Sequence, residues 1–86
     1  MIHAIDEKMH SHPKTLRIQR NARCAAIGLW TLAMSWCDDH DTGGLVPAYV
    51  VEEFGATKQV AEWLVTVGYW ESAEDGYRIP DWPVDD

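Results

Sequence analysis

The longest apolar stretch of the chain runs for about fourteen residues, from Cys24 to Cys37. Its apolar side chains recur mainly at steps of three and four, the period of one helix face. This stripe comprises Ala26, Leu29, Trp30, Ala33, Trp36 and Cys37, and Ile27 and Met34 widen it. We predict a central helix over roughly residues 22–38, N-capped by Asn21 and covered on more than one side. Gly28 inside it predicts that another backbone passes close by.

Proline, glycine and capping residues divide the remaining sequence into short elements. Pro13 suits the first turn of a short helix that runs to about Gln19 and turns Leu16 and Ile18 inward. The sequence Asp41-Thr42-Gly43-Gly44 is a stop signal for the central helix. After it we expect a strand at 44–46, a helix at 47–54 closed by Gly55, and a helix at 58–67 between Thr57 and Gly68. A hairpin of strands 69–72 and 77–80 follows, joined by Ala73-Glu74-Asp75-Gly76, in which Asp-Gly is the hairpin signal.

This order of elements is that of a helix-turn-helix followed by a wing. The predicted fold class is mainly α with a small β-hairpin, a winged helix-turn-helix of order α-α-β-α-α-β-β. Eighty-six residues suffice for one domain, so we expect a single domain over 1–86 with an ordered core at about 2–82. The two cysteines lie about 20 Å apart on one predicted helix, too far for a disulfide. Reduced thiols are typical of a cytoplasmic protein.

Several short motifs resemble those of a group of small actinobacterial phage and prophage proteins. They are His12-Pro13-Lys14, Gly28-Leu29-Trp30, Gly43-Gly44-Leu45-Val46-Pro47, Gly68-Tyr69-Trp70-Glu71, Asp75-Gly76-Tyr77-Arg78-Ile79 and Asp81-Trp82. Those proteins are in turn similar to the N-terminal winged-helix domain of phage replication-initiation and replisome-organiser proteins. The resemblance covers roughly residues 2–82 and implies a role in phage DNA replication or gene control. Because the chain stops after the winged helix, it implies an accessory or regulatory role.

Charge is distributed unevenly along the chain. Residues 1–23 carry five cations against two carboxylates, a balance of +3, and residues 24–86 carry two cations against twelve carboxylates, a balance of −10. The candidate nucleic-acid-binding residues are Lys14, Arg17, Arg20 and Arg23, which would form a slanted ridge on a continuous helix, and Lys58 and Gln59 at the start of the 58–67 helix. We expect weak, salt-sensitive binding of double-stranded DNA. The alternative is a solvated ridge, or one paired with the chain's own carboxylates.

The acidic residues point to a second function, a module that binds and modulates a host or phage protein without contacting DNA. The candidate residues for this interaction are Asp38, Asp39, Asp41, Glu62, Glu74 and Asp75. Glu74 and Asp75 stand at the wing tip, where a DNA-binding wing usually carries Arg or Lys, and an acidic body would steer a basic partner. A homodimer is a further alternative. The resemblance favours DNA binding, whereas charge alone favours the protein partner.

Catalysis, metal binding and membrane insertion have no support in the sequence. There is no nucleophile elbow, phosphate loop or H-E-x-x-H motif, so we expect no enzyme activity, cofactor or small-molecule substrate. Cys37-Asp38-Asp39-His40-Asp41 and the pair His10 and His12 offer ligand atoms but lack the paired spacing of a zinc site. The apolar stretch is too short to span a bilayer, and no signal peptide is visible, so we expect a cytoplasmic protein.

Overall fold

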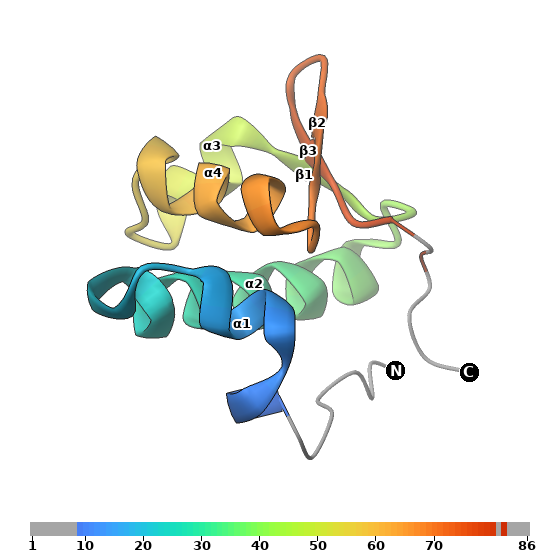
Figure 1. The fold of residues 1–86 in the computed structure, drawn as a ribbon. Coiled ribbons are helices and arrows are strands. Elements are labelled where there is room, and N and C mark those ends of the chain that lie inside the picture. Colours follow the sequence, from blue (N-terminus) through green and yellow to red (C-terminus); the bar gives the residue numbers. More distant parts are fainter. Residues whose placement is uncertain (1–8, 81, 83–86) are drawn as a thin grey trace.

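The structure, a computed structural model, describes residues 9–80 and Trp82. The expected ends of the ordered core, residues 2–8 and 81, lie outside the described residues. After a 3₁₀ turn at Met9–Ser11 come α1 (Pro13–Arg17), α2 (Arg20–His40), β1 (Leu45–Pro47), α3 (Ala48–Glu53), α4 (Lys58–Val67), β2 (Glu71–Ala73) and β3 (Gly76–Arg78) (Figure 1). The fold is therefore mainly helical with a small antiparallel sheet, in the order of elements that the sequence predicts.

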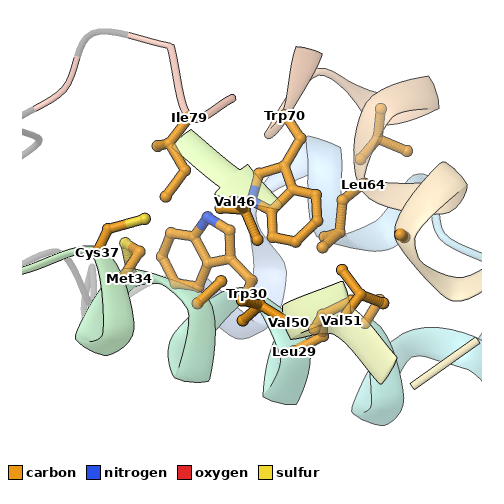
Figure 2. Close-up of a cluster of buried hydrophobic side chains, with 14 of the residues drawn as sticks. Leu29, Trp30, Met34, Cys37, Val46, Val50, Val51, Leu64, Trp70 and Ile79 are labelled. Atoms are coloured by element: carbon orange, nitrogen blue, oxygen red, sulfur yellow. The ribbon is translucent and has the colours of Figure 1, made fainter. Parts of the chain in front are cut away.

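The helix α2 runs through the core, as its apolar stripe predicts. Its buried side chains are Ala26, Leu29, Trp30, Ala33, Met34 and Cys37. They meet side chains from β1, α3 and α4, and also Trp70 and Ile79, in one cluster (Figure 2). Trp70 is only 1% exposed, and a buried aromatic side chain of this size removes about 150–250 Å² from water. Trp36, the remaining member of the stripe, is partly exposed.

Two predictions about α2 are wrong. The helix begins at Arg20 after the N-cap Gln19, whose side chain makes no capping hydrogen bond, so Asn21 is not the cap. No backbone from another described element crosses at Gly28, because a Cβ added there would meet no described atom within 4 Å apart from those of its own stretch of helix. Gly28 instead lies on the exposed side of the helix. The helix ends at His40, where Asp41 takes the left-handed conformation (φ 55°) and donates its N–H to the Cys37 carbonyl.

The short helix α1 also differs from its prediction. It ends at Arg17, and Ile18 is extended and fully buried, whereas Leu16 is 49% exposed. The prediction that Leu16 turns inward is therefore wrong. The inward position on α1 belongs to Thr15, whose hydroxyl lies 2.8 Å from the Tyr69 hydroxyl. Because neighbouring helix positions point about 100° apart, burying Thr15 turns Leu16 to solvent.

The three strands pair in the order β1-β3-β2, so β1 and β2 form the edges of the sheet. Val46 and Ser72 both lie opposite Tyr77 in the register. The outward-facing carbonyl of Leu45 accepts from the Thr42 hydroxyl at 2.9 Å and from the Cys37 thiol at 3.3 Å. These bonds, together with the absence of an N–H on the neighbouring Pro47, leave β1 poorly suited to pairing with another chain.

The hairpin between β2 and β3 turns through Glu74 and Asp75, within the predicted connection at 73–76, and the two flanking residues of that connection belong to the strands. Gly76 is the first residue of β3, and a Cβ at this position would overlap the carbonyl oxygen of Val46. Glycine is thus required here by the close approach of β1 and β3.

The helix α4 begins and ends as the sequence predicts. The Thr57 side chain accepts from the Val60 N–H at 3.2 Å, and Gly68 ends the helix in the left-handed conformation (φ 98°). Ala61, Leu64 and Val67 face the core. The opposite side of α4, which carries Lys58 and Glu62, is therefore exposed next to the hairpin.

Candidate functional site

A cleft of about 570 Å³ separates α3 and α4 from the tip of the β2–β3 hairpin. Its lining comprises Ala48, Val51 and Glu52 from α3, Lys58 and Glu62 from α4, and the hairpin residues Ser72, Ala73, Glu74, Asp75, Gly76 and Tyr77. The cleft exists because the hairpin projects beyond the helices, as Figure 1 shows, while Trp70 and Ile79, which flank its two strands, are buried in the core. It therefore joins three elements that are separate in the sequence.

The lining of the cleft is acidic. It holds four carboxylates, Glu52, Glu62, Glu74 and Asp75, and one cation, Lys58. Lys58 Nζ lies 4.0 Å from Glu62 Oε2, one helical turn away, and both side chains are exposed. An exposed pair of this kind contributes no more than about 0.5 kcal/mol to stability. One cation against four carboxylates neutralises only part of the negative charge. The cleft keeps a negative potential that would attract cations and repel phosphate.

Tyr77 supplies an aromatic wall beside these carboxylates. Burial raises the pKa of its phenol above the usual value, and the negative charge of Glu62 raises this pKa further. The phenol is therefore neutral at physiological pH. The ring of Tyr77 also packs against Trp70, with ring centroids 5.2 Å apart, which holds it in place. An aromatic face beside carboxylates can bind a lysine or arginine side chain through cation–π contact and charged hydrogen bonds.

The four cations that the sequence groups into a ridge do not form one. The ridge requires a continuous helix, but Ile18 and Gln19 separate α1 from α2. Lys14 is half-buried and contacts the end of α4, with Nζ 3.4 Å from the Gly68 carbonyl and 5.4 Å from the centre of the Tyr69 ring. Arg23 donates to the carbonyls of Ile18 and Leu16 at 2.8 Å and 2.9 Å.

Two cations of the predicted ridge, Arg17 and Arg20, are exposed on either side of the break between α1 and α2. The other two, Lys14 and Arg23, make hydrogen bonds to backbone carbonyls within the chain. The remaining nucleic-acid candidates, Lys58 and Gln59, are exposed at the start of α4, where Lys58 borders the acidic cleft.

The structure brings together half of the predicted acidic residues. Glu62, Glu74 and Asp75 line the cleft, whereas Asp38, Asp39 and Asp41 are exposed at the end of α2 and do not line it. Sequence reasoning missed Glu52 and Tyr77. The sequence alone does not distinguish Glu52 from its neighbour Glu53, which has the same side chain and does not line the cleft. Choosing between them requires the orientation of α3.

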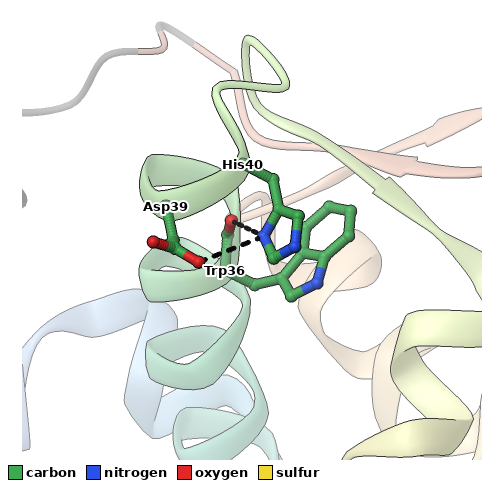
Figure 3. Close-up of polar contacts among 3 residues, drawn as sticks. All are labelled: Trp36, Asp39 and His40. Atoms are coloured by element: carbon green, nitrogen blue, oxygen red, sulfur yellow. Dashed lines mark hydrogen bonds and ion pairs between the residues drawn. The ribbon is translucent and has the colours of Figure 1, made fainter.

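The potential ligand atoms at the end of α2 serve local contacts. His40 stacks on Trp36, with ring centroids 4.5 Å apart and an angle of 19° between the planes (Figure 3). Its Nδ1 lies 3.1 Å from the Trp36 carbonyl oxygen and 3.5 Å from Asp39 Oδ2. The other predicted pair includes His12, whose Nδ1 accepts from the Lys14 N–H. Within residues 9–80 and Trp82, no group of three or more potential ligands gathers around a metal position.

None of the helices in the described part of the chain combines the length and hydropathy of a membrane span. Comparison of the chain with protein-family models, with curated proteins and with solved structures found no match.

Proposed function

We propose that this chain is a winged helix-turn-helix module whose acidic cleft binds a cationic segment of another protein. In this fold α3 and α4 are the helix-turn-helix, joined by a short turn at Gly55, and the β2–β3 hairpin is the wing. The order of the elements and the sheet order β1-β3-β2 support this assignment.

The observation that carries the function is the charge of the cleft between α4 and the hairpin. In a DNA-binding winged helix these two elements would meet the phosphates and the base edges. In this chain they present Glu62, Glu74 and Asp75, with Glu52 beside them and Lys58 as the one cation of the lining. Carboxylates at this position repel DNA and favour a partner rich in lysine or arginine.

The cleft provides an aromatic surface as well as negative charge. The stem of a lysine or arginine side chain can pack on the Tyr77 ring while its cationic head meets Glu62 or Glu74. Because these carboxylates are exposed, they act mainly on the rate of association and on specificity, and binding weakens as salt shortens the screening length to about 8 Å at 0.15 M.

Fluorescence anisotropy with a labelled arginine-rich peptide at low salt tests the proposal. Glu62→Gln combined with Glu74→Gln removes two charges from the cleft and should weaken binding by about tenfold. The matched control, Asp41→Asn with Glu71→Gln, removes two exposed charges elsewhere and should weaken it much less. Equal losses in the two double variants would mean that the peptide responds to net charge alone, and the cleft proposal would then be wrong.

DNA binding is the second candidate, and the exposure of Arg17 and Arg20 at the α1–α2 break favours it. The same anisotropy measurement with a labelled duplex would detect it, and loss of binding in Arg17→Ala with Arg20→Ala would assign it to this site. Duplex binding tighter than peptide binding would reverse the order of the two candidates. The role in phage replication or gene control that the resemblance implies stays a prediction.

A further inference from the structure

The outward face of α2 has an unusual composition for an exposed helix face. Its exposed residues between the two ends are Cys24, Ala25, Gly28, Leu32 and Ser35, which share one side opposite the buried stripe. The sequence has no charged side chain between Arg23 and Asp38. A helix face that meets water normally carries charged and polar residues. The described residues thus leave a neutral helix face uncovered, with Leu32 47% exposed at its middle.

The shape of this face is complementary to itself. Gly28 forms a gap on this face, because a Cβ added there would meet no described atom within 4 Å apart from those of its own stretch of helix. Leu32, one helical turn further along, projects from the same side. When two such helices run antiparallel, with their crossing point midway between these residues, Leu32 of each copy lies over Gly28 of the other.

The charges at the two ends of α2 are also complementary in this arrangement. Arg20 is exposed in the first turn, and Asp38 and Asp39 are exposed in the last. Eighteen residues span five full helical turns, so Arg20 and Asp38 lie on the same flank. An antiparallel second copy therefore brings its Arg20 to the acidic end of the first, and the contact occurs twice by symmetry.

We propose that this face of α2 binds a second copy of the chain in a two-fold antiparallel dimer. The exposed face of α2 has a cationic start, a neutral middle and an acidic end. Its charges are therefore complementary to those of a second α2 that runs in the opposite direction. The elements α3, α4 and the hairpin lie on the other side of α2 (Figure 1), so a dimer leaves both acidic clefts open. The dimer does not depend on what the cleft binds.

Analytical ultracentrifugation of the full chain between 10 µM and 1 mM tests the dimer. Leu32→Glu, which places a charge at the centre of the face, should raise the dimer Kd by at least about tenfold. The control Leu16→Glu changes a leucine of equal exposure on α1 and should leave Kd unchanged. A monomer over the whole range, or a dimer that tolerates Leu32→Glu, would overturn the proposal.

A charge exchange tests the antiparallel order separately. One variant carries Arg20→Glu and the other carries Asp38→Lys with Asp39→Lys, so each should repel its own copy and remain monomeric. Mixed in equal amounts, the two variants should form a heterodimer. The changes place anions at the start and cations at the end of α2, which the helix dipole favours, so each chain should stay folded. Failure of the mixture to associate, with both chains folded by circular dichroism, would contradict the arrangement.

Discussion

The guanidinium of Arg23 donates from Nε to the backbone carbonyl of Ile18 at 2.8 Å, and from Nη2 to the carbonyl of Leu16 at 2.9 Å. These two bonds tie the end of α1 to the first turn of α2, across the residues that interrupt the helix. They also satisfy carbonyl groups that the break would otherwise leave without a helical partner. Arg23 therefore holds the junction of two helices.

Arg23→Ala should lower the free energy of unfolding by about 1–2 kcal/mol, because it removes charged donors from two backbone carbonyls. Arg17→Ala removes an exposed cation from the same region and should change it by less than about 0.5 kcal/mol. Urea denaturation measures both. Equal effects of the two substitutions would show that the two hydrogen bonds of Arg23 contribute nothing to stability.

Substituting alanine for glycine should change the free energy of unfolding in opposite directions at positions 28 and 76. Gly28→Ala meets open space on a helix and should raise the free energy of unfolding by up to about 1 kcal/mol. Gly76→Ala drives a Cβ into the Val46 carbonyl oxygen and should lower it by about 1–3 kcal/mol. Thermal and urea denaturation of the two variants check this pair, measured at protein concentrations where the chain is monomeric. A destabilising Gly28→Ala under these conditions would contradict the open space at this position.

The two thiols should differ in reactivity and in their effect at alkaline pH. Cys24 is exposed, whereas Cys37 is buried, and burial raises the pKa of its thiol although the contact with Thr42 partly lowers it. A thiol reagent at pH 8 should modify Cys24 quickly and Cys37 slowly, because the thiolate is the reactive form. Equal rates would contradict the burial of Cys37.

The sign of the pH effect follows from the raised pKa of Cys37. A thiol that ionises less readily in the folded state stabilises the fold fully below its unfolded pKa of 9.0, and this contribution is lost as pH rises through the folded pKa. Stability should therefore fall as the pH rises above about 9, and Cys37→Ala should reduce this slope. Tyr77, whose pKa is raised from 10.0 by burial and by the charge of Glu62, should add a further loss of stability above pH 10.

Thr57→Ala should lower the free energy of unfolding by about 1 kcal/mol, because the Val60 N–H loses its side-chain acceptor at the start of α4. Thr66→Ala changes an exposed threonine inside the same helix and serves as the control. Urea denaturation compares the two variants. A loss no larger at Thr57 than at Thr66 would refute the capping role.

The fold was predictable wherever a local rule agreed with the tertiary packing. The apolar stripe of α2, the Thr57 cap and the Gly68 stop of α4 each express a local preference that the core also requires. The sequence also predicts two helices before β1, but it places the break between them at 20–21, whereas the structure has it at Ile18 and Gln19. Burial of Ile18 and the hydrogen bonds from Arg23, both tertiary contacts, fix this position, and no local pattern indicates them.

The candidate site was only half predictable for a similar reason. The sequence marks Glu62, Glu74 and Asp75 as acidic and exposed, but it does not show that α3 adds Glu52 to them. It also groups Asp38, Asp39 and Asp41 with them by charge alone, although they lie at the end of α2. A cleft between elements depends on how these elements pack, and residue type carries little information about that.

The most direct test of the cleft is an NMR titration of the ¹⁵N-labelled chain with an arginine-rich peptide, and separately with a short DNA duplex. We expect the peptide to shift the amide signals of Glu62, Ser72, Glu74 and Tyr77 at low salt, and the duplex to leave these signals unchanged. Peptide shifts spread over all acidic surfaces, or duplex shifts centred on α4 and the hairpin, would contradict the assignment of the cleft to a cationic protein segment.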